Sequence, residues 1–317
     1  MKTKAFFLPL LFFLLIQTGY SEFKTETRIA LGTFFQITIE ETKDNKEILN
    51  QAFKKVDELE KKLSIFEKES EVSKLNKYKS ASVSNETIEV IKKAIEISKI
   101  TDGAFDISCK PLVDLYKKYG KEGIPPKEEE IKNTLKKVNW KNIEIKGNNI
   151  SLKDGMEIDL GGIAKGYIVD KAVEFLKSKG IKNGLVNAGG DLYCWGNNPS
   201  GKKWKIAIRD PFEKEKTIGK IEITEKGVAT SGDYEQYVKI KGQKFSHIVD
   251  PRTGKTVQDF PVSITIIADD CTTADALATG FFVLGIKSIE IANKLKDVEI
   301  LIIDKNKKNY KSKHFPL

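Results

Sequence analysis

Residues 156–188, MEIDLGGIAKGYIVDKAVEFLKSKGIKNGLVNA, decide the fold class of this 317-residue chain. The segment 156–160 predicts a strand that leads into a pair of glycines. Residues 163–179 carry apolar side chains at helical spacing, and the short apolar run 184–188 predicts another strand. A strand, a helix and a strand are therefore expected in immediate succession here.

The flanking sequence mixes both kinds of element without regular strand–helix–strand alternation. Apolar residues at spacings of three and four predict a helix over 52–66 and a second one over 88–98. Residues 28–40 predict a strand interrupted at Gly32, and 143–152 predict a hairpin. Further expected elements are strands at 191–196, 204–209, 220–224, 234–240, 244–249 and 262–268, a short helix ending near 138, a helix over 272–284 and a final helix–strand pair. We expect an α+β fold, with mixed strands and helices around one core.

Composition excludes several classes of protein. An apolar fraction of 40% and a charged fraction of 31% are typical of a folded domain rather than a disordered or collagen-like chain. The net charge of +9 arises from 54 basic and 45 acidic residues spread along the chain. Because no basic–aromatic recognition motif accompanies this charge, nucleic acid is not an expected partner. The lysine-rich stretch 305–313 is interpreted as a solvated edge, with attraction to a membrane surface as the alternative.

The amino terminus has the anatomy of an export signal. Two lysines precede the apolar run 5–16, which is shorter than the roughly 20 residues that a spanning helix needs. Small residues at positions 19 and 21 favour cleavage before Glu22. We expect a signal peptide at 1–21 and one folded domain at 22–317, with an uncleaved anchor as the alternative. No cysteine follows the apolar run, so a lipid-modified amino-terminal cysteine is not expected.

The first candidate site lies at the glycine pair. A predicted strand ends near Asp159, the glycines turn the chain, and a helix begins with Lys165 in its first turn. Helix amino termini present free N–H groups and the positive end of the helix dipole, which suits a phosphate. The glycine spacing matches neither a Walker loop nor the dinucleotide fingerprint. From spacing alone, an ordinary strand–helix turn is the favoured interpretation and a ligand site the alternative.

The second candidate is the pair Asp275 and Thr279, four residues apart. On a helix their oxygens leave the same face, and a carboxylate with a hydroxyl and water suits a hard divalent ion. The alternative is that Thr272 or Thr273 caps the helix and Asp275 completes the cap, and the residues alone favour this capping role.

Two weaker candidates complete the set. His247 ends a predicted strand and is one of two histidines, so it is a candidate base near neutral pH, while Asp250 in the following turn is either an acid or a turn former. The segment 101–112 is expected to be a loop between helices that carries an apolar residue and the carboxylate of Asp106. Taken singly, each of these signals is weak.

The order of the motifs is more informative than any one of them. The chain contains, in sequence, LGTFFQITI, SEVSKLN, TDGAFDISCKPL, IDLGGIAKGYIVD, NAGGDLYCWG, HIVDPRTGK and DALATG. This succession closely resembles the ApbE family, the FAD:protein FMN transferases. The resemblance implies a magnesium-dependent α+β enzyme that cleaves FAD and links FMN through a phosphoester to a threonine or serine of an acceptor protein, releasing AMP. It further implies export to the periplasm, acceptors among membrane redox-complex subunits, and 22–317 as the catalytic domain. Association with the inner membrane stays an open alternative, because the lipidation cysteine common in exported members of the family is missing here.

The resemblance also assigns roles to residues. It implies magnesium ligands at Gly162 (main-chain carbonyl), Asp275 and Thr279. It implies FAD contacts at Leu31, Phe66, Ala104, Phe105, Asp106, Asp159, Lys165 and His247. We expect His247 to be the base for the acceptor hydroxyl, with Asp250 in reserve, and Phe66 or Phe105 to cover the isoalloxazine ring. Leu31 replaces the family's usual methionine and Phe66 its frequent tyrosine, which bears on flavin affinity.

Two other functions fit part of the pattern. Water in place of the acceptor hydroxyl would make the protein an FAD pyrophosphatase that yields FMN and AMP, and this needs the same ion and phosphate cradle. An exported carrier that binds FAD without cutting it needs no ion at the pyrophosphate, so Asp159, Asp275 and Thr279 argue against it.

Overall fold

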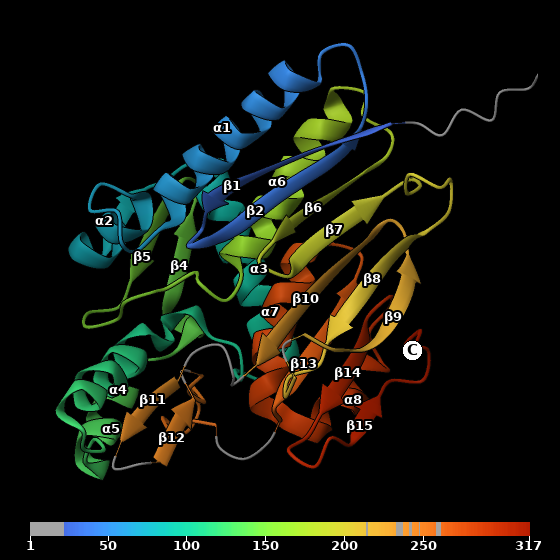
Figure 1. Cartoon of the computed structure of the whole chain (residues 1–317). Coiled ribbons are helices and arrows are strands. Elements are labelled where there is room, and N and C mark those ends of the chain that lie inside the picture. The colour runs from blue at the N-terminus through green and yellow to red at the C-terminus, as the bar shows by residue number, and fades with distance from the viewer. Residues whose placement is uncertain (1–21, 214, 233–236, 241–242, 247, 258–260) are drawn as a thin grey trace, which may run out of the picture.

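The computed structural model describes residues 22–213, 215–232, 237–240, 243–246, 248–257 and 261–317 (Figure 1). Within these residues the largest sheet has eight strands, and every neighbouring pair in it is antiparallel. Its spatial order is β1 (Phe23–Ala30), β2 (Thr33–Glu40), β6 (Gly184–Ala188), β7 (Asp191–Trp195), β10 (Lys226–Gly232), β13 (Ser263–Ala268), β14 (Glu299–Ile303) and β15 (Asn309–Lys311).

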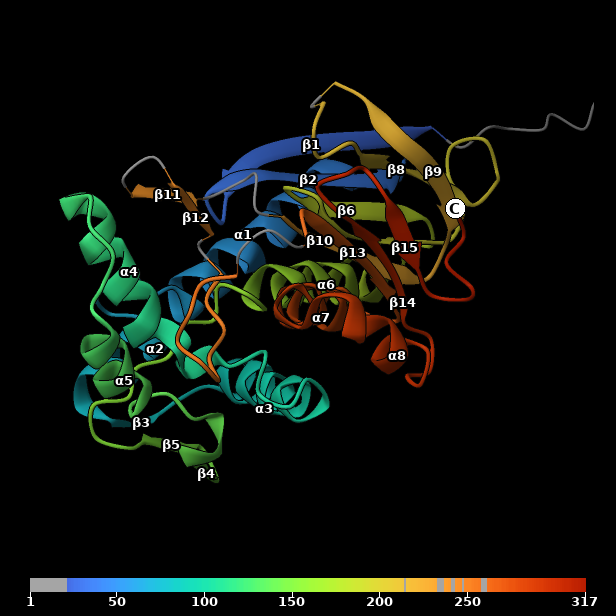
Figure 2. The same cartoon turned by 90° about the horizontal axis from the view of Figure 1, so that it is seen from below.

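Three long helices cover one face of this sheet, as Figure 2 shows from below. They are α1 (Asn45–Leu63), α6 (Ala164–Ser178) and α7 (Cys271–Leu284). Residues such as Phe35, Ile37 and Ile39 of β2 alternate inward and are fully buried against this layer, together with Phe53 of α1 and Phe281 of α7. The helices and this sheet face form the main hydrophobic cluster.

The opposite face of the sheet is covered over part of its width by a two-stranded sheet. This hairpin consists of β8 (Trp204–Arg209) and β9 (Thr217–Ile223). Trp204 and Ile221 pack with Val228 of β10 and Ile267 of β13 in a second cluster. Because β13 is covered from both sides, all its residues are buried, which explains its nearly continuous apolar sequence.

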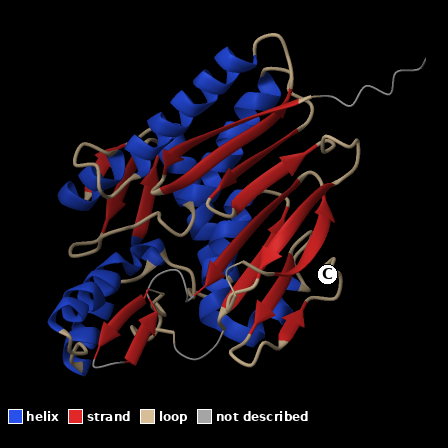
Figure 3. Cartoon of the chain, viewed as in Figure 1, coloured by secondary structure: helices blue, strands red, loops and turns tan. Residues whose placement is uncertain are grey.

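Most of the remaining elements form a flank beside the helix layer, and Figure 3 distinguishes its helices (blue) from its strands (red). The flank contains α2 (Glu71–Tyr78), α3 (Asn85–Ile100), α4 (Lys110–Glu122), α5 (Glu128–Leu135), a sheet of β3 (Ser80–Ser82), β5 (Asn149–Leu152) and β4 (Ile143–Lys146), and the pair β11 (Tyr237–Ile240) and β12 (Gln243–Ser246). The short helix α8 (Ser288–Ala292) lies elsewhere, after α7 and against β14, as Figure 2 shows. Leu112, Tyr116 and Ile131 of α4 and α5 form a third, small cluster with Val249. The expected single core is therefore one main cluster with two satellites.

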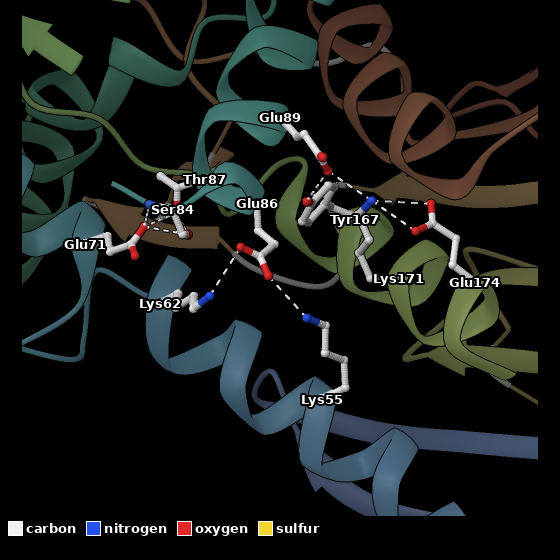
Figure 4. A network of polar contacts seen from close by, with 10 residues as sticks. All are labelled: Lys55, Lys62, Glu71, Ser84, Glu86, Thr87, Glu89, Tyr167, Lys171 and Glu174. Atoms are coloured by element: carbon white, nitrogen blue, oxygen red, sulfur yellow. Dashed lines mark hydrogen bonds and ion pairs between the residues drawn. The ribbon is translucent and has the colours of Figure 1, made fainter. Parts of the chain in front are cut away.

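Polar contacts fix α3 against α1 and α6 (Figure 4). Glu86 at the start of α3 lies 3.2 Å from both Lys55 and Lys62 of α1. Glu89 accepts a hydrogen bond from the Tyr167 hydroxyl at 2.8 Å and pairs with Lys171 at 2.9 Å, both on α6. The backbone amide of Glu86 and its two lysines lower the pKa of this carboxyl to about 2, against the opposing effect of burial.

Many predicted elements are confirmed, and some of the exceptions are instructive. The predicted strand 156–160 is wrong: the segment alternates buried and half-buried residues but has no strand neighbour. Asn76 instead binds both backbone groups of Ile158, with Nδ2 donating to the carbonyl at 2.8 Å and Oδ1 accepting from the amide at 2.7 Å. An extended chain satisfied by a side chain gives the strand pattern without a strand.

The interrupted strand at 28–40 is a hairpin. Leu31 and Gly32 both have positive φ, 55° and 69°, which is the geometry of a type I′ turn between β1 and β2. The first predicted helix also ends earlier than expected, at Leu63, because Ser64 is extended. Phe66 therefore lies beyond α1 instead of on its apolar face.

Strand β10 escaped prediction. Its sequence KGVATSG has little apolar content, yet it is central in the sheet. A Cβ on Gly227 would lie 2.4 Å from the backbone nitrogen of Cys271, so the start of α7 demands a glycine there. The predicted strand 244–249 ends early, because β12 stops at Ser246, and Val249 makes an isolated bridge with Thr256.

The expected signal peptide, residues 1–21, lies outside the described residues, as do parts of the predicted strand 234–240. Across the described ranges, no helix combines the length and the apolar character that crossing a membrane requires.

Candidate functional site

One cavity of about 670 Å³ lies where the β1–β2 turn, the start of α6 and the middle of α7 meet. This volume is within the 300–1,000 Å³ that is typical of small-molecule pockets. Ten of the residues predicted for the site line it: Leu31, Phe66, Ala104, Phe105, Asp106, Asp159, Gly162, Lys165, Asp275 and Thr279. Residues as far apart in the sequence as Leu31 and Thr279 thus line one cavity, as the family resemblance implied.

The glycine turn carries the chain into α6 beside the cavity. Asp159 shapes the turn, because its Oδ1 accepts from the amide of Gly161 at 2.9 Å, while its own amide donates to the carbonyl of Ile107 at 2.8 Å. The helix start is already partly occupied by protein acceptors: the amide of Gly166 donates to Oδ2 of Asp275 at 3.0 Å. A phosphate here would meet a carboxylate as well as the helix terminus.

Asp275 is not a helix cap. The cap of α7 is Asp270, whose side chain accepts from the amide of Thr273 at 2.5 Å, and Asp170 of α6 accepts from the amides of Cys271 and Thr272 at 2.9 and 2.8 Å. The capping interpretation of Asp275 is therefore wrong. Asp275 is only 4% exposed and faces the cavity from the second turn of the helix.

Lys165 pairs with two carboxylates. Its ammonium contacts Asp191 at the start of β7 and lies 3.7 Å from Oδ1 of Asp275. Burial opposes the charge on Lys165, but the two carboxylates more than offset it, so its pKa is raised. Burial also raises the pKa of Asp275, and the nearby ammonium limits that rise. The charge of Lys165 is thus shared with protein partners and is not a free cation awaiting phosphate.

Sequence reasoning missed Asp191. Asp191 is 4% exposed, and its Oδ1 accepts a hydrogen bond from the backbone amide of Thr230 in β10 at 3.4 Å. The available signal was its position as the one acidic residue of the motif NAGGDLYCWG. The partnership with Lys165 is a tertiary contact, so the motif alone did not reveal it.

Gly162, Asp275 and Thr279 offer a donor set that fits magnesium. A Cβ on Gly162 would lie 3.3 Å from the Thr279 hydroxyl and from the Phe105 ring, so the glycine backbone is pressed against that hydroxyl. Ser231 of β10 adds a second hydroxyl 3.4 Å from that of Thr279. No group of three histidine, cysteine or acidic residues suited to a metal occurs among the described residues. One carboxylate with neutral oxygens suits Mg²⁺, which keeps waters and recruits substrate phosphates.

The loop 104–109 forms a second wall. Oδ1 of Asp106 accepts from the amide and the hydroxyl of Ser108 at 2.8 and 2.7 Å, and its Oδ2 accepts from the amide of Trp140 at 2.9 Å. Burial raises the pKa of Asp106, although these bonds favour its charged form. The carboxylate is thus engaged in shaping the loop, which places Ala104 and Phe105 on the cavity surface.

Apolar side chains line the outer part of the cavity. Phe66 is 85% exposed, and Leu31 presents its side chain from a backbone position that disfavours ordinary residues. Neither is held by packing on all sides, so both are available to a flat ligand. Lys110 and Lys117 of α4, which the sequence analysis did not single out, also line the cavity.

The two predicted bases have different outcomes. His247 lies outside the described residues, although its neighbours Ile248 and Val249 line the cavity. Asp250 does not line it; both of its carboxylate oxygens accept from the Arg252 guanidinium at 2.9 Å. Asp250 is engaged in the turn, and its role as reserve base stays a prediction.

The fold and cavity define an α+β protein with a nucleotide-sized site beside an oxygen donor set. The ApbE family model matches residues 31–302, so the chain belongs to the ApbE family. The FAD:protein FMN transferase of Vibrio cholerae is 35% identical over 284 residues, covering 86% of this chain and 84% of that protein. The FAD:protein FMN transferase of Haemophilus influenzae is 34% identical over 264 residues, with coverages of 76% and 74%.

Solved structures agree with this assignment. The flavin transferase ApbE from Vibrio cholerae superposes with a TM-score of 0.82 at 32% identity, covering 93% of this chain and 98% of that one. The ApbE protein from Thermotoga maritima superposes with a TM-score of 0.84 at 33% identity, with coverages of 92% and 97%. The predicted α+β class and the family resemblance are both confirmed.

Proposed function

We propose that this protein is an FAD:protein FMN transferase that uses Mg²⁺ to move FMN from FAD to a threonine or serine hydroxyl of an acceptor protein. The observation that carries the proposal is the convergence of ten predicted site residues on one cavity. The names of the similar proteins support flavin transfer. Export to the periplasm and acceptors in membrane redox complexes remain part of the proposal.

The proposed reaction is a phosphoryl transfer. The acceptor hydroxyl oxygen attacks the FMN phosphorus, the bond from that phosphorus to the bridging oxygen of AMP breaks, and the hydroxyl proton passes to a base. His247 is the proposed base, which typically contributes about 100- to 10,000-fold in rate. A bound Mg²⁺ would neutralise charge on the phosphates and the departing AMP.

The residues of the chain provide position and charge. Gly162, Asp275 and Thr279 would hold the ion, and the amide of Gly166 keeps the Asp275 carboxylate turned toward the cavity. Phe66, Leu31 and Phe105 would cover the flavin ring, since apolar walls suit its faces. Such positioning and electrostatics are the main protein contributions to phosphoryl transfer.

The test incubates purified protein with FAD, Mg²⁺ and a threonine-containing acceptor, followed by mass spectrometry of the acceptor. Transfer predicts an acceptor heavier by one FMN and the release of AMP. Free FMN and AMP with an unmodified acceptor would indicate hydrolysis, and intact bound FAD would indicate a carrier; either result contradicts the proposal.

Matched variants test the proposed roles. Asp275→Ala is expected to abolish transfer, whereas Asp304→Ala, which removes another buried carboxylate remote from the cavity, is expected to retain it. His247→Ala should reduce transfer about 100-fold or more, while His314→Ala, at the other histidine, should not. Equal rates in the two histidine variants would move the base elsewhere.

A further inference from the structure

The Lys165 ammonium lies between Asp275, which is proposed to bind the metal ion, and Asp191, which is not. The ammonium contacts Asp191 directly, whereas it is 3.7 Å from Oδ1 of Asp275, beyond ordinary hydrogen-bond length. The lysine chain is flexible, so a movement of under ~1 Å would give it a direct bond to Asp275. Something must therefore favour the contact with Asp191.

Asp191 is held in place by the sheet. It is the first residue of β7, pairs with Ala188 across the β6–β7 turn, and is 4% exposed. The turn residues Gly189 and Gly190 have φ of 64° and 113°, which only glycine adopts readily, so the turn delivers Asp191 to one fixed place. Its carboxylate is a rigid counter-charge, not a mobile surface group.

We propose that Asp191 is a positioning residue that holds the Lys165 ammonium away from Asp275 and so leaves Asp275 available to a divalent cation. The inference rests on the proposed function, because it assumes the cation site at Asp275 and Thr279. Two carboxylates and one ammonium carry a net charge of −1, which attracts a dication. If Asp191 is neutralised, this charge becomes zero and Asp275 is the carboxylate left in this group for Lys165 to pair with.

The test measures binding of Mn²⁺, as a probe for the cation, by electron paramagnetic resonance in FAD-free protein. Asp191→Asn is expected to weaken Mn²⁺ binding about 10- to 100-fold, the usual effect of losing a residue that supports a metal ligand. Asp304→Asn, which removes a buried carboxylate outside the cavity, is the control and should bind as the wild type does.

The double variant Asp191→Asn with Lys165→Gln separates positioning from general structural support. Removing the ammonium frees Asp275 again, so the double variant should recover Mn²⁺ affinity to within about 3-fold of the wild type. A difference of that size is smaller than the usual coupling between two sites. If Asp191→Asn alone does not fold, the double variant, in which both side chains are neutral amides, is compared directly with the wild type.

Two outcomes overturn the inference. Unchanged affinity in Asp191→Asn would show that Lys165 does not compete for Asp275, and a double variant as weak as the single one would show that Asp191 only supports the fold. Absence of Mn²⁺ binding in the wild-type protein would instead remove the metal site itself, so failure of the proposed function is distinguishable from failure of the inference.

Discussion

Gly166 allows α6 to approach α7 closely enough for the site to form. A Cβ at this position would lie 2.3 Å from the carbonyl oxygen of Cys271 and 2.9 Å from the Cβ of Asp275. Since the first of these atoms is rigid backbone, Gly166→Ala must separate the helices by about 1 Å to restore ordinary contact. The same movement would stretch the 3.0 Å bond from the Gly166 amide to Asp275 beyond hydrogen-bond range.

The expected loss of stability follows from three contributions. Overpacking costs about 1–3 kcal/mol. Losing a buried hydrogen bond to a charged acceptor costs about 1.5–3 kcal/mol. Alanine regains about 1 kcal/mol over glycine in a helix, so the net decrease in the free energy of unfolding is about 1.5–5 kcal/mol.

Urea unfolding at pH 7 measures this difference, and Mn²⁺ binding measures the displacement of Asp275. Gly120→Ala, at a half-buried position in α4 that does not line the cavity, is the matched control and should stay within about 1 kcal/mol of the wild type. A Gly166→Ala protein with wild-type stability and undiminished Mn²⁺ affinity would refute the close-contact argument.

Three further substitutions test other parts of the structure. Burial raises the pKa of Asp170 to about 7 despite bonds from Thr272, so the native state keeps a proton that the unfolded state loses near pH 4. This contribution to the free energy of unfolding, of order 4 kcal/mol, is present below about pH 4 and is lost as the pH rises through 7. Asp170→Asn should abolish this pH dependence in urea midpoints measured from pH 4 to 8. Glu86→Gln should cost about 0.5–1 kcal/mol at low salt and less at 1 M salt, and an equal cost in both would contradict the ion-pair explanation. Gly227→Ala should lower the free energy of unfolding by about 1–3 kcal/mol, because its new methyl meets the backbone of Cys271. Gly219→Ala should cost less in the same urea assay, because its methyl meets only the side chain of Leu317.

The sequence was sufficient where the signal is local. The strands 184–188 and 204–209 have their predicted bounds, and α6 and α7 differ from prediction by one residue at the ends, because periodicity is a property of neighbouring residues. The motifs also predicted ten cavity residues, since their order reflects a common fold. This information needs no knowledge of which segments meet.

Tertiary structure decided what depends on distant partners. Residues 156–160 have a strand pattern, but the backbone of Ile158 is hydrogen-bonded by the side chain of Asn76, 82 positions away, and not by a neighbouring strand. Asp275 resembles a helix cap until the amide of Gly166, 109 positions earlier, is seen to bind it. Likewise, the ammonium of Lys165 contacts Asp191, which no spacing rule connects to it. Hydrogen bonds and charges act through space, so their partners are fixed only once the sheet and helices have brought the segments together.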